Sequence, residues 1–433
     1  MSYAAEEFYS YLDRLNEHRY NFSLTRINRA VKALGNPQND FSVIHLAGSN
    51  GKGSTAAYLD SVLRAHKIKT GVYTSPHIFG VRERFAVNGK TVPEKLFVKT
   101  GIKTRELLAD KNIKLTYFEF LTALAMVIFR EAKVKTAVIE AGLGGRYDAT
   151  NLKYEDKKLS VITSVCPEHV NYLGKTPSAI LKEKSRIIKK GRAVCNIKEP
   201  ALKKTLKREF KKRVFFPADL FSFVSLAHFR GRLIVNLKRK DTGDRLRVIS
   251  AMPEFFQADN IITALMCVKV LSGELGLNMK KSVKAISETC LPGRLSRHEG
   301  YYLSAAHNAE AIAGMLATLR SMYPRAGIKF VFSALADKDL GAIFSVFKDY
   351  LPLEIILTSI DNKRAISIDK MARFSVKYGI KFRVEPDNKK ALNRAVKEAK
   401  KGGVAVAGGS FYLVSSYIKE NKPGLKPQKP AAG

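Results

Sequence analysis

The sequence predicts an α/β protein with two domains, each built on a mainly parallel β-sheet. Short apolar runs typical of buried strands alternate with amphipathic stretches at helical spacing along most of the chain. The pattern is interrupted at 291–295, where proline and glycine occur together. We therefore expect a first domain over residues 1–292, a second over 293–420, and a disordered basic tail over 421–433.

The first domain is expected to open with two amphipathic helices within 8–35, before its sheet begins. Buried strands are then predicted at 41–47, 70–77, 136–140 and 159–165, helices at 56–63, 92–112, 116–132 and 257–272, and an antiparallel insertion over 205–250.

The second domain repeats the strand–helix alternation on a smaller scale, as in a Rossmann-like fold. Strands are predicted at 301–304, 328–333, 353–359, 380–384 and 403–408, and helices at 309–321, 340–350, 367–377 and 388–400.

Composition indicates a globular protein without a membrane segment. The chain has 433 residues, of which 45% are hydrophobic, and it contains no apolar run of about 18 residues. The N-terminus lacks the basic and apolar regions of a secretory signal, and four cysteines are scattered without metal-like spacing. We expect a cytoplasmic monomer that has no membrane partner.

The net charge is unusual: the chain has 75 lysines and arginines but only 39 aspartates and glutamates, which gives a formal charge of +36. Such an excess can indicate a nucleic acid or an anionic surface as a partner. The lysines are spread along the whole chain, however, which favours a general basic bias on solvated faces. Nucleic acid is therefore not expected as a partner, although a positive field would attract anionic substrates.

A glycine-rich turn at 48–55 lies between the strand at 41–47 and a helix, which is the context of a P-loop. Backbone N–H groups and the helix N-terminus would bind a phosphate chain, with Lys52 on the terminal phosphates and Ser54 on a magnesium ion. The spacing is shorter than in the generic pattern, so an ordinary turn with an incidental lysine is the alternative.

Four polar side chains are expected beyond the carboxyl ends of the parallel strands, where such sheets bind ligands. They are Ser54, Ser75, Glu140 and His169. Hydroxyl and carboxylate oxygens beside a P-loop can hold one or two magnesium ions. Histidine is an uncommon magnesium ligand, so the alternative is that His169 forms hydrogen bonds beside the metal site without binding the ion.

Ordered blocks over residues 8–417 resemble the folylpolyglutamate synthase and dihydrofolate synthase family of the Mur ligase superfamily. The most specific block is Glu-Ala-Gly-Leu-Gly-Gly-Arg-Tyr-Asp-Ala-Thr-Asn at 140–151. The other matching blocks are 48–54 with Ser49 for threonine, 74–77, 83–84, 88–89, 183–184, Gln257 with Asn260, 292–295, 306–308, 337–339 and 409–410.

The resemblance implies a Mur-ligase-type P-loop ATPase domain and an ATP-dependent amide ligase. The substrates would be ATP, L-glutamate, and dihydropteroate or a reduced folate, with an acyl phosphate as the intermediate. Two Mg²⁺ ions are implied, one on Ser54, Ser75 and Glu140 and one on Glu140 and His169.

The resemblance also assigns residues to the ATP site, to catalysis and to a pterin pocket. The ATP site would comprise Gly48, Asn50, Gly51, Lys52, Gly53, Ser54, Asn260, Arg294 and Ser304, with Lys52, Lys184 and His307 as catalytic residues and Thr116, Phe118, Asp148 and Ala149 around the pterin. Lys184 matches a lysine that is carbamylated in the superfamily, and a solvated lysine is the alternative. Phe118 would stack on the pterin ring, and core packing is its alternative.

Three departures from the family pattern affect these assignments. Ser304 replaces an aspartate that contacts the ATP ribose, Arg186 replaces a glycine near the metal site, and Glu168 replaces an aspartate. We expect an active enzyme that binds ATP more weakly than the family pattern implies.

Two other functions are compatible with part of this pattern. One is another Mur-type ligase acting on a nucleotide-linked peptide precursor, and the other is a basic ATP-binding protein without catalysis. The 74–77 block argues against the first, and the retention of Lys52, Glu140, His169 and Lys184 argues against the second.

Overall fold

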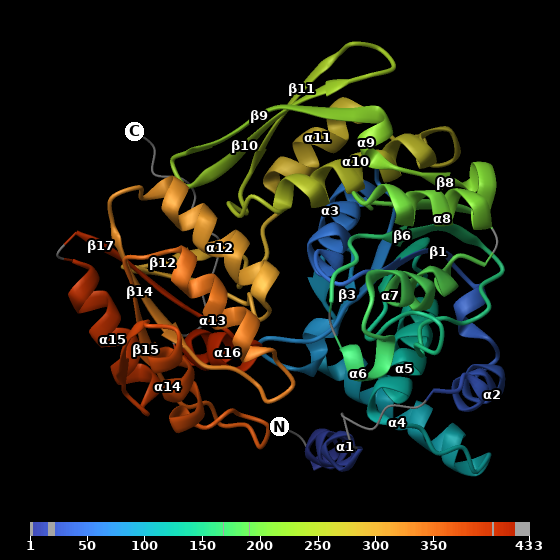
Figure 1. Ribbon diagram of the computed structural model, residues 1–433. Helices are drawn as coiled ribbons and strands as arrows, with labels where there is room; N and C mark the ends of the chain where they lie inside the picture. Colours follow the sequence, from blue (N-terminus) through green and yellow to red (C-terminus); the bar gives the residue numbers. More distant parts are fainter. Residues whose placement is uncertain (1–2, 16–21, 168, 190, 401, 421–433) are drawn as a thin grey trace. The chain divides into compact units, whose positions relative to one another are not determined.

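The structure is a computed structural model that describes residues 3–15, 22–167, 169–189, 191–400 and 402–420 (Figure 1). The tail expected at 421–433 lies outside the described residues. The chain divides into two compact units, the first made of 1–222, 238–246 and 259–286 and the second of 223–237, 247–258 and 287–433. Among the described helices, none has the length and apolar character needed to cross a membrane.

The first unit is organised around a sheet with the strand order β4-β3-β2-β5-β1-β6-β7-β8. Its strands are β1 (Ser42–Ala47), β2 (Thr70–Tyr73), β3 (Phe85–Val87), β4 (Lys90–Thr91), β5 (Thr136–Glu140), β6 (Lys157–Ile162), β7 (Arg192–Cys195) and β8 (Val214–Phe215). The pairings of β1 with β5 and β6, and of β2 with β5, are parallel. This confirms the predicted α/β class, because parallel strands connected through helices form its central sheet.

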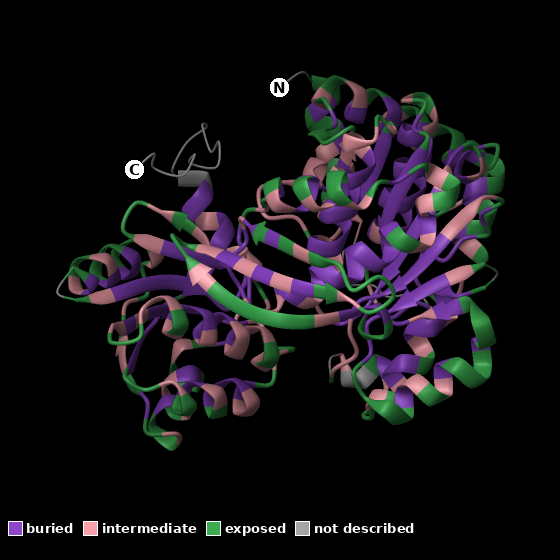
Figure 2. Cartoon of the chain, turned by 90° about the horizontal axis from the view of Figure 1, so that it is seen from above, coloured by how far each residue is buried: buried purple, intermediate pink, exposed green. Residues whose placement is uncertain are grey.

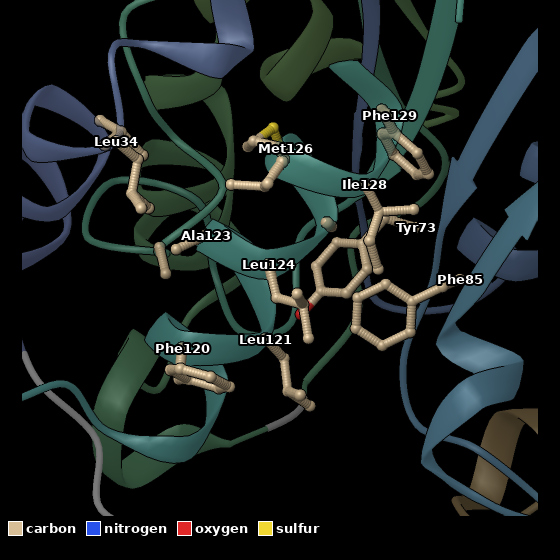
Figure 3. Close-up of a cluster of buried hydrophobic side chains, with 14 of the residues drawn as sticks. Leu34, Tyr73, Phe85, Phe120, Leu121, Ala123, Leu124, Met126, Ile128 and Phe129 are labelled. Atoms are coloured by element: carbon tan, nitrogen blue, oxygen red, sulfur yellow. The ribbon is translucent and has the colours of Figure 1, made fainter. Parts of the chain in front are cut away.

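The helices before residue 289 are α1 (Tyr3–Arg14), α2 (Thr25–Ala33), α3 (Lys52–Ala65), α4 (Glu94–Asp110), α5 (Tyr117–Glu131), α6 (Val170–Leu173), α7 (Pro177–Lys184), α8 (Pro200–Phe210), α9 (Pro217–Leu220), α10 (Gln257–Leu275) and α11 (Met279–Glu288). Of these, α3, α5 and α8 contact strands of this sheet. Helix α5 is apolar almost all round and lies in the main core cluster, where Phe120, Leu121 and Leu124 are fully buried. Figure 3 shows these side chains together with Tyr73 and Phe85, which belong to the same cluster. The ring centroids of Tyr73 and Phe85 are 5.4 Å apart.

The second unit contains a sheet with the order β12-β13-β17-β14-β15-β16. Its elements are β12 (Ser296–His298), β13 (Tyr301–Ser304), α12 (Ala309–Met322), β14 (Gly327–Phe332), α13 (Leu340–Asp349), β15 (Leu353–Leu357), α14 (Ile368–Lys377), β16 (Lys381–Val384), α15 (Asn388–Ala399), β17 (Gly403–Gly408) and α16 (Phe411–Glu420). Strands β13, β17, β14, β15 and β16 are parallel to one another. The strands of the two large sheets are mostly buried (Figure 2), as expected when helices cover a sheet on both faces.

The prediction of an antiparallel insertion over 205–250 is wrong in its first part. Helix α8 continues to Phe210, and β8 pairs in parallel with β7. The apolar residues Leu202, Leu206 and Phe210 recur every four residues and are buried, which is a helical and not a strand period. A separate sheet begins only at Phe221, with β9 (Phe221–Phe229), β10 (Arg232–Arg239) and β11 (Arg245–Ser250) in the order β11-β10-β9.

Candidate active site

The glycine-rich turn joins β1 to α3 with a backbone that only glycine adopts without strain. Gly48 and Gly51 have φ angles of 153° and 87°. A Cβ atom on Gly48 would lie 1.9 Å from Thr163 Oγ1, and one on Gly51 would lie 2.1 Å from Asn260 Oδ1. The turn is therefore packed closely on both sides, and Asn260 lies directly against it.

Hydrogen bonds tie this turn to the segment that follows β6. Asn50 N donates to Ser164 Oγ at 2.8 Å, and Ser49 N donates to Ser164 O at 3.0 Å. Thr163 Oγ1 in turn donates to Asn50 O at 2.6 Å. The conformation of the turn is thus stabilised by a neighbouring strand end as well as by its own residues.

The first turn of α3 carries the groups that would meet a phosphate. Lys52 Nζ donates to Gly48 O at 2.8 Å and to Ser49 O at 3.3 Å, so its ammonium group lies over the turn. Ser54 follows one position after Gly53 and is 1% exposed. An ammonium group beside a helix N-terminus gives a site complementary to an anion.

Two of the candidate metal ligands lie together at the carboxyl edge of the sheet. Strands β2 and β5 are parallel neighbours, and just beyond them Ser75 N donates to Glu140 Oε2 at 3.2 Å. Glu140 is buried, whereas His169 is partly exposed, has a left-handed backbone and directly precedes α6. Among the described residues, no group of three or more His, Cys, Asp or Glu side chains could hold a metal ion.

The donor set of this candidate metal site is chemically suited to magnesium. It consists of the Ser54 and Ser75 hydroxyls and the Glu140 carboxylate, and hard oxygen donors are the ligands that Mg²⁺ takes. Magnesium sites use few protein carboxylates and complete their coordination with phosphate and water oxygens. The residues present therefore fit a magnesium ion bound together with ATP.

Lys184 is buried at the end of α7, next to the 140–151 block. It is 1% exposed, so the alternative of a solvated lysine is wrong. A Cβ atom on Gly145 would lie 2.8 Å from Lys184 O, and Arg146 N donates to Glu183 O at 3.0 Å. Glycine at 145 therefore allows the block to pack against the backbone beside this lysine.

The candidate pterin residues Thr116 and Phe118 belong to the start of α5. Thr116 is the N-cap, and it forms a capping box with Glu119, whose carboxylate accepts from Thr116 N at 2.8 Å. The Phe118 ring is half-buried and lies over Gly142, where an added Cβ atom would be 2.6 Å from Phe118 Cζ. Phe118 therefore packs on the core cluster and also borders the 140–151 block.

Asp148 and Ala149, the other two pterin candidates, are each 6% exposed. The Asp148 carboxylate accepts hydrogen bonds from Leu143 N at 2.8 Å, Thr150 N at 3.0 Å and Thr150 Oγ1. Burial raises the pKa of Asp148, and these hydrogen bonds oppose the rise. The carboxylate thus organises its own loop whether or not it also contacts a ligand.

In the second unit, the predicted residues Ser304 and His307 lie at and just beyond the carboxyl end of β13. Ser304 is 1% exposed, and its Oγ accepts from Ala306 N at 3.4 Å. His307 Nδ1 is 2.9 Å from Ala305 O, which can only accept, so Nδ1 carries a hydrogen. The ring also lies against Phe411, with centroids 5.4 Å apart.

Arg294 lies near a buried carboxyl group that we did not predict as part of the site. Glu254 is fully buried, and its Oε1 has no hydrogen-bond partner. Burial raises the pKa of Glu254 to about 7, although the nearby Arg294 charge acts in the opposite direction.

Neither the burial of His45 nor the contacts of Arg84 were predicted from the sequence. Arg84 is buried, donates from Nε to His77 Nδ1 at 3.0 Å, and lies 5.4 Å from the Tyr117 ring centroid. His45 is a fully buried histidine within β1. The available signal was a polar residue inside an otherwise apolar strand.

Comparison with protein families identifies the class to which this fold belongs. The Mur ligase middle domain matches residues 46–268, and the Mur ligase, glutamate ligase domain matches residues 293–411. The first match alone covers more than half of the chain. The chain therefore belongs to the Mur ligase family.

Individual relatives narrow this assignment. The probable dihydrofolate synthetase of Schizosaccharomyces pombe is 33% identical over 295 residues, which are 66% of this chain and 70% of that protein. The dihydrofolate synthase/folylpolyglutamate synthase of Bacillus subtilis is 29% identical over 429 residues, 92% of this chain and 95% of that protein. The Mycobacterium tuberculosis folylpolyglutamate synthase complexed with ADP has a TM-score of 0.86 and 26% identity, covering 98% of this chain and 99% of that one. The protein is thus a carbon–nitrogen ligase of the folylpolyglutamate synthase and dihydrofolate synthase type.

Proposed function

We propose that this protein uses ATP to join the amino group of L-glutamate to the carboxyl group of dihydropteroate, of a reduced folate, or of both. The observation that carries the proposal is the P-loop with Lys52, next to which Ser75 and Glu140 meet at the same sheet edge. The names of the relatives, dihydrofolate synthase and folylpolyglutamate synthase, support this choice of substrates.

The proposed reaction has two steps. A carboxylate oxygen of the pterin substrate attacks the γ-phosphorus of ATP, the bond to the bridging oxygen breaks, and ADP leaves an acyl phosphate. The glutamate nitrogen then attacks the acyl carbon, phosphate departs with the electron pair of the C–O bond, and the nitrogen loses a proton. Negative charge gathers on the transferring phosphoryl group, so Lys52 and the α3 N-terminus would stabilise it electrostatically.

The same proposal assigns the metal ligands. Ser54, Ser75 and Glu140 would hold one Mg²⁺, and Glu140 with His169 a second. When bound, such ions neutralise charge on phosphate oxygens. A carbamate on Lys184 would replace a buried cation by an anion able to hold the second ion.

The remaining candidates divide into two groups. Thr116, Phe118, Asp148 and Ala149 would form the pterin pocket, with the Phe118 ring stacking on the pterin. Asn260, Arg294 and Ser304 would contact the nucleotide, and Arg294 can pair with phosphate through two N–H groups. His307 is proposed as the catalytic residue of the second unit.

The direct test measures phosphate release from ATP with dihydropteroate or tetrahydrofolate, each with and without L-glutamate, and determines the product mass. We expect glutamate-dependent release with at least one pterin and a product heavier by one glutamyl residue. Absence of glutamate-dependent release with every pterin substrate would refute the proposal.

Two lysine variants show whether the P-loop carries this activity. Lys52→Ala should abolish turnover, because it removes the ammonium group over the turn. Lys69→Ala, a change at an exposed lysine, should leave turnover at the wild-type rate. Equal activity of the two variants would show that the P-loop assignment is wrong.

A further inference from the structure

A line of hydrogen bonds runs from Lys157, at the start of β6, to the Asp148 carboxylate. Lys157 Nζ lies 3.1 Å from His45 Nδ1, and His45 Nε2 lies 2.8 Å from Thr150 Oγ1. Thr150 Oγ1 then donates to Asp148 Oδ1. The last three of these residues are buried, and His45 is not exposed at all. None of the steps assigned above uses His45 or Lys157.

The chemistry of the groups gives every hydrogen bond in this line the same direction. Thr150 Oγ1 has a single hydrogen and donates it to Asp148 Oδ1, so it must accept the hydrogen bond from His45 Nε2, which therefore carries a hydrogen. Burial, reinforced by the Lys157 and Lys189 charges, lowers the pKa of His45 well below its ordinary value, so the ring is neutral. With its hydrogen on Nε2, a neutral ring has none on Nδ1, so Nδ1 accepts from Lys157 Nζ, which also donates to Ile187 O at 2.6 Å.

The groups around His45 agree with this assignment. Tyr154 lies with its ring centroid 6.1 Å from that of His45, and its hydroxyl donates to Thr150 O at 2.6 Å. Lys189 donates to Asn151 O at 2.8 Å, and burial lowers the pKa of Lys189. Apart from Asp148 at the far end, these neighbours offer no anion that would favour a charged imidazole.

We propose that His45 is a positioning residue for pterin binding: through the Thr150 hydroxyl it orients the Asp148 carboxylate and with it the loop from Gly142 to Asn151. This inference rests on the proposed function, because it takes that loop as one wall of the pterin pocket. Asp148 Oδ1 accepts a hydrogen bond from the Thr150 hydroxyl, and Oδ2 accepts one from Leu143 N. Asp148 therefore connects Leu143, near the start of the loop, with Thr150, near its end. The Thr150 hydroxyl fixes the tautomer of His45, and Lys157 Nζ donates to the Nδ1 atom of this tautomer.

A conservative pair of Thr150 variants tests this role. Thr150→Val removes the hydroxyl at nearly constant shape, and Thr150→Ser keeps it. Because hydrogen bonds to charged groups contribute about 1.5–3 kcal/mol, Thr150→Val should raise the KM for dihydropteroate by about tenfold or more. The KM for ATP should change less than about twofold, and Thr150→Ser should stay close to wild type on both substrates.

The matched control is Thr136→Val, at a buried threonine on the opposite end of β5 from Glu140. It should leave both KM values unchanged. An equal rise in the two KM values for Thr150→Val, or a Thr150→Ser enzyme as impaired as Thr150→Val, would overturn the positioning role.

A second measurement does not depend on turnover. In the ¹⁵N NMR spectrum of the full chain with labelled histidine, the His45 signals, assigned by their loss in His45→Gln, should show a neutral ring with hydrogen on Nε2 from pH 6 to pH 8. A ring with hydrogen on Nδ1, or an imidazolium, would overturn the hydrogen-bond line. Wild-type protein with this tautomer but no activity on any pterin would instead contradict the proposed function, and with it the role in pterin binding.

Discussion

Replacing Glu254 by glutamine should stabilise the second unit at neutral and alkaline pH and have little effect at pH 4.5. Burial raises the pKa of Glu254 from 4.5 to about 7, so the folded chain keeps a proton that the unfolded chain has lost between these values. The stability due to this group is complete below pH 4.5 and is lost as the pH rises through 7. The difference between the two pKa values corresponds to about 3 kcal/mol above pH 7.

Glutamine has nearly the shape of glutamate and carries no charge at any pH, so the variant should avoid this loss. For a unit of this size, about 3 kcal/mol corresponds to a gain of about 6–12 °C in the Tm of its unfolding transition at pH 8. Differential scanning calorimetry of wild type and Glu254→Gln at several pH values from 4.5 to 8.5 measures it.

The matched control for this experiment is Glu299→Gln, at an exposed glutamate of the same unit. Its Tm difference from wild type should not change with pH. A Tm difference for Glu254→Gln that is the same at pH 5 and pH 8 would refute the reasoning, because a buried titrating carboxyl must make that difference depend on pH.

Three further predictions concern other positions. Burial lowers the pKa of Lys157 from 10.5 to about 7, so the unfolded chain holds the extra proton between these values. The free energy of unfolding should therefore rise by up to about 1.4 kcal/mol per pH unit from pH 7 to 10, and Lys157→Met should flatten that rise in denaturant titrations. Gly145→Ala should cost about 1–3 kcal/mol in urea unfolding, because its Cβ atom would meet the Lys184 carbonyl oxygen at 2.8 Å. Gly273→Ala, in a helix with open space around it, should stabilise by about 0.5–1 kcal/mol, and similar effects of the two changes would contradict the packing argument. Ser304→Asp should lower the KM for ATP in steady-state kinetics, and an unchanged KM would argue against a ribose contact at this position.

Local sequence patterns were sufficient to predict the central strands β2, β5, β1 and β6 of the first sheet and the parallel strands of the second, whereas the short strands β3, β4, β7, β8 and β12 were not predicted. The run 41–47 is apolar enough to indicate a buried strand, and the structure has β1 there. The apolar run ending at Glu140 was recognised for the same reason. The spacing of the apolar residues distinguishes a strand from a helix. The prediction failed at α8 because the alternation expected for 205–250 was extended too far toward the N-terminus, over residues that have a helical period.

Contacts between distant segments could not be predicted from the same patterns. Nothing local to His45 reveals that Thr150 and Lys157 lie on either side of its ring, since those contacts depend on sheet order and register. The close approach of Gly145 to the Lys184 backbone likewise joins positions almost forty residues apart in the chain. Motif matching found Lys184, but only packing shows that its side chain is removed from solvent.

The attachment of the P-loop to Thr163 and Ser164 has a consequence for protein engineering. The turn at 48–51 is stabilised by hydroxyl groups more than a hundred residues away, so the smallest transferable nucleotide-binding unit is a pair of adjacent strand ends. A transplant of 48–55 alone into a foreign strand–helix junction would lack the Thr163 and Ser164 hydroxyl groups that stabilise the turn. Including 163–166 on the neighbouring strand would supply it, and the graft would then need a host sheet with two parallel strands in this register.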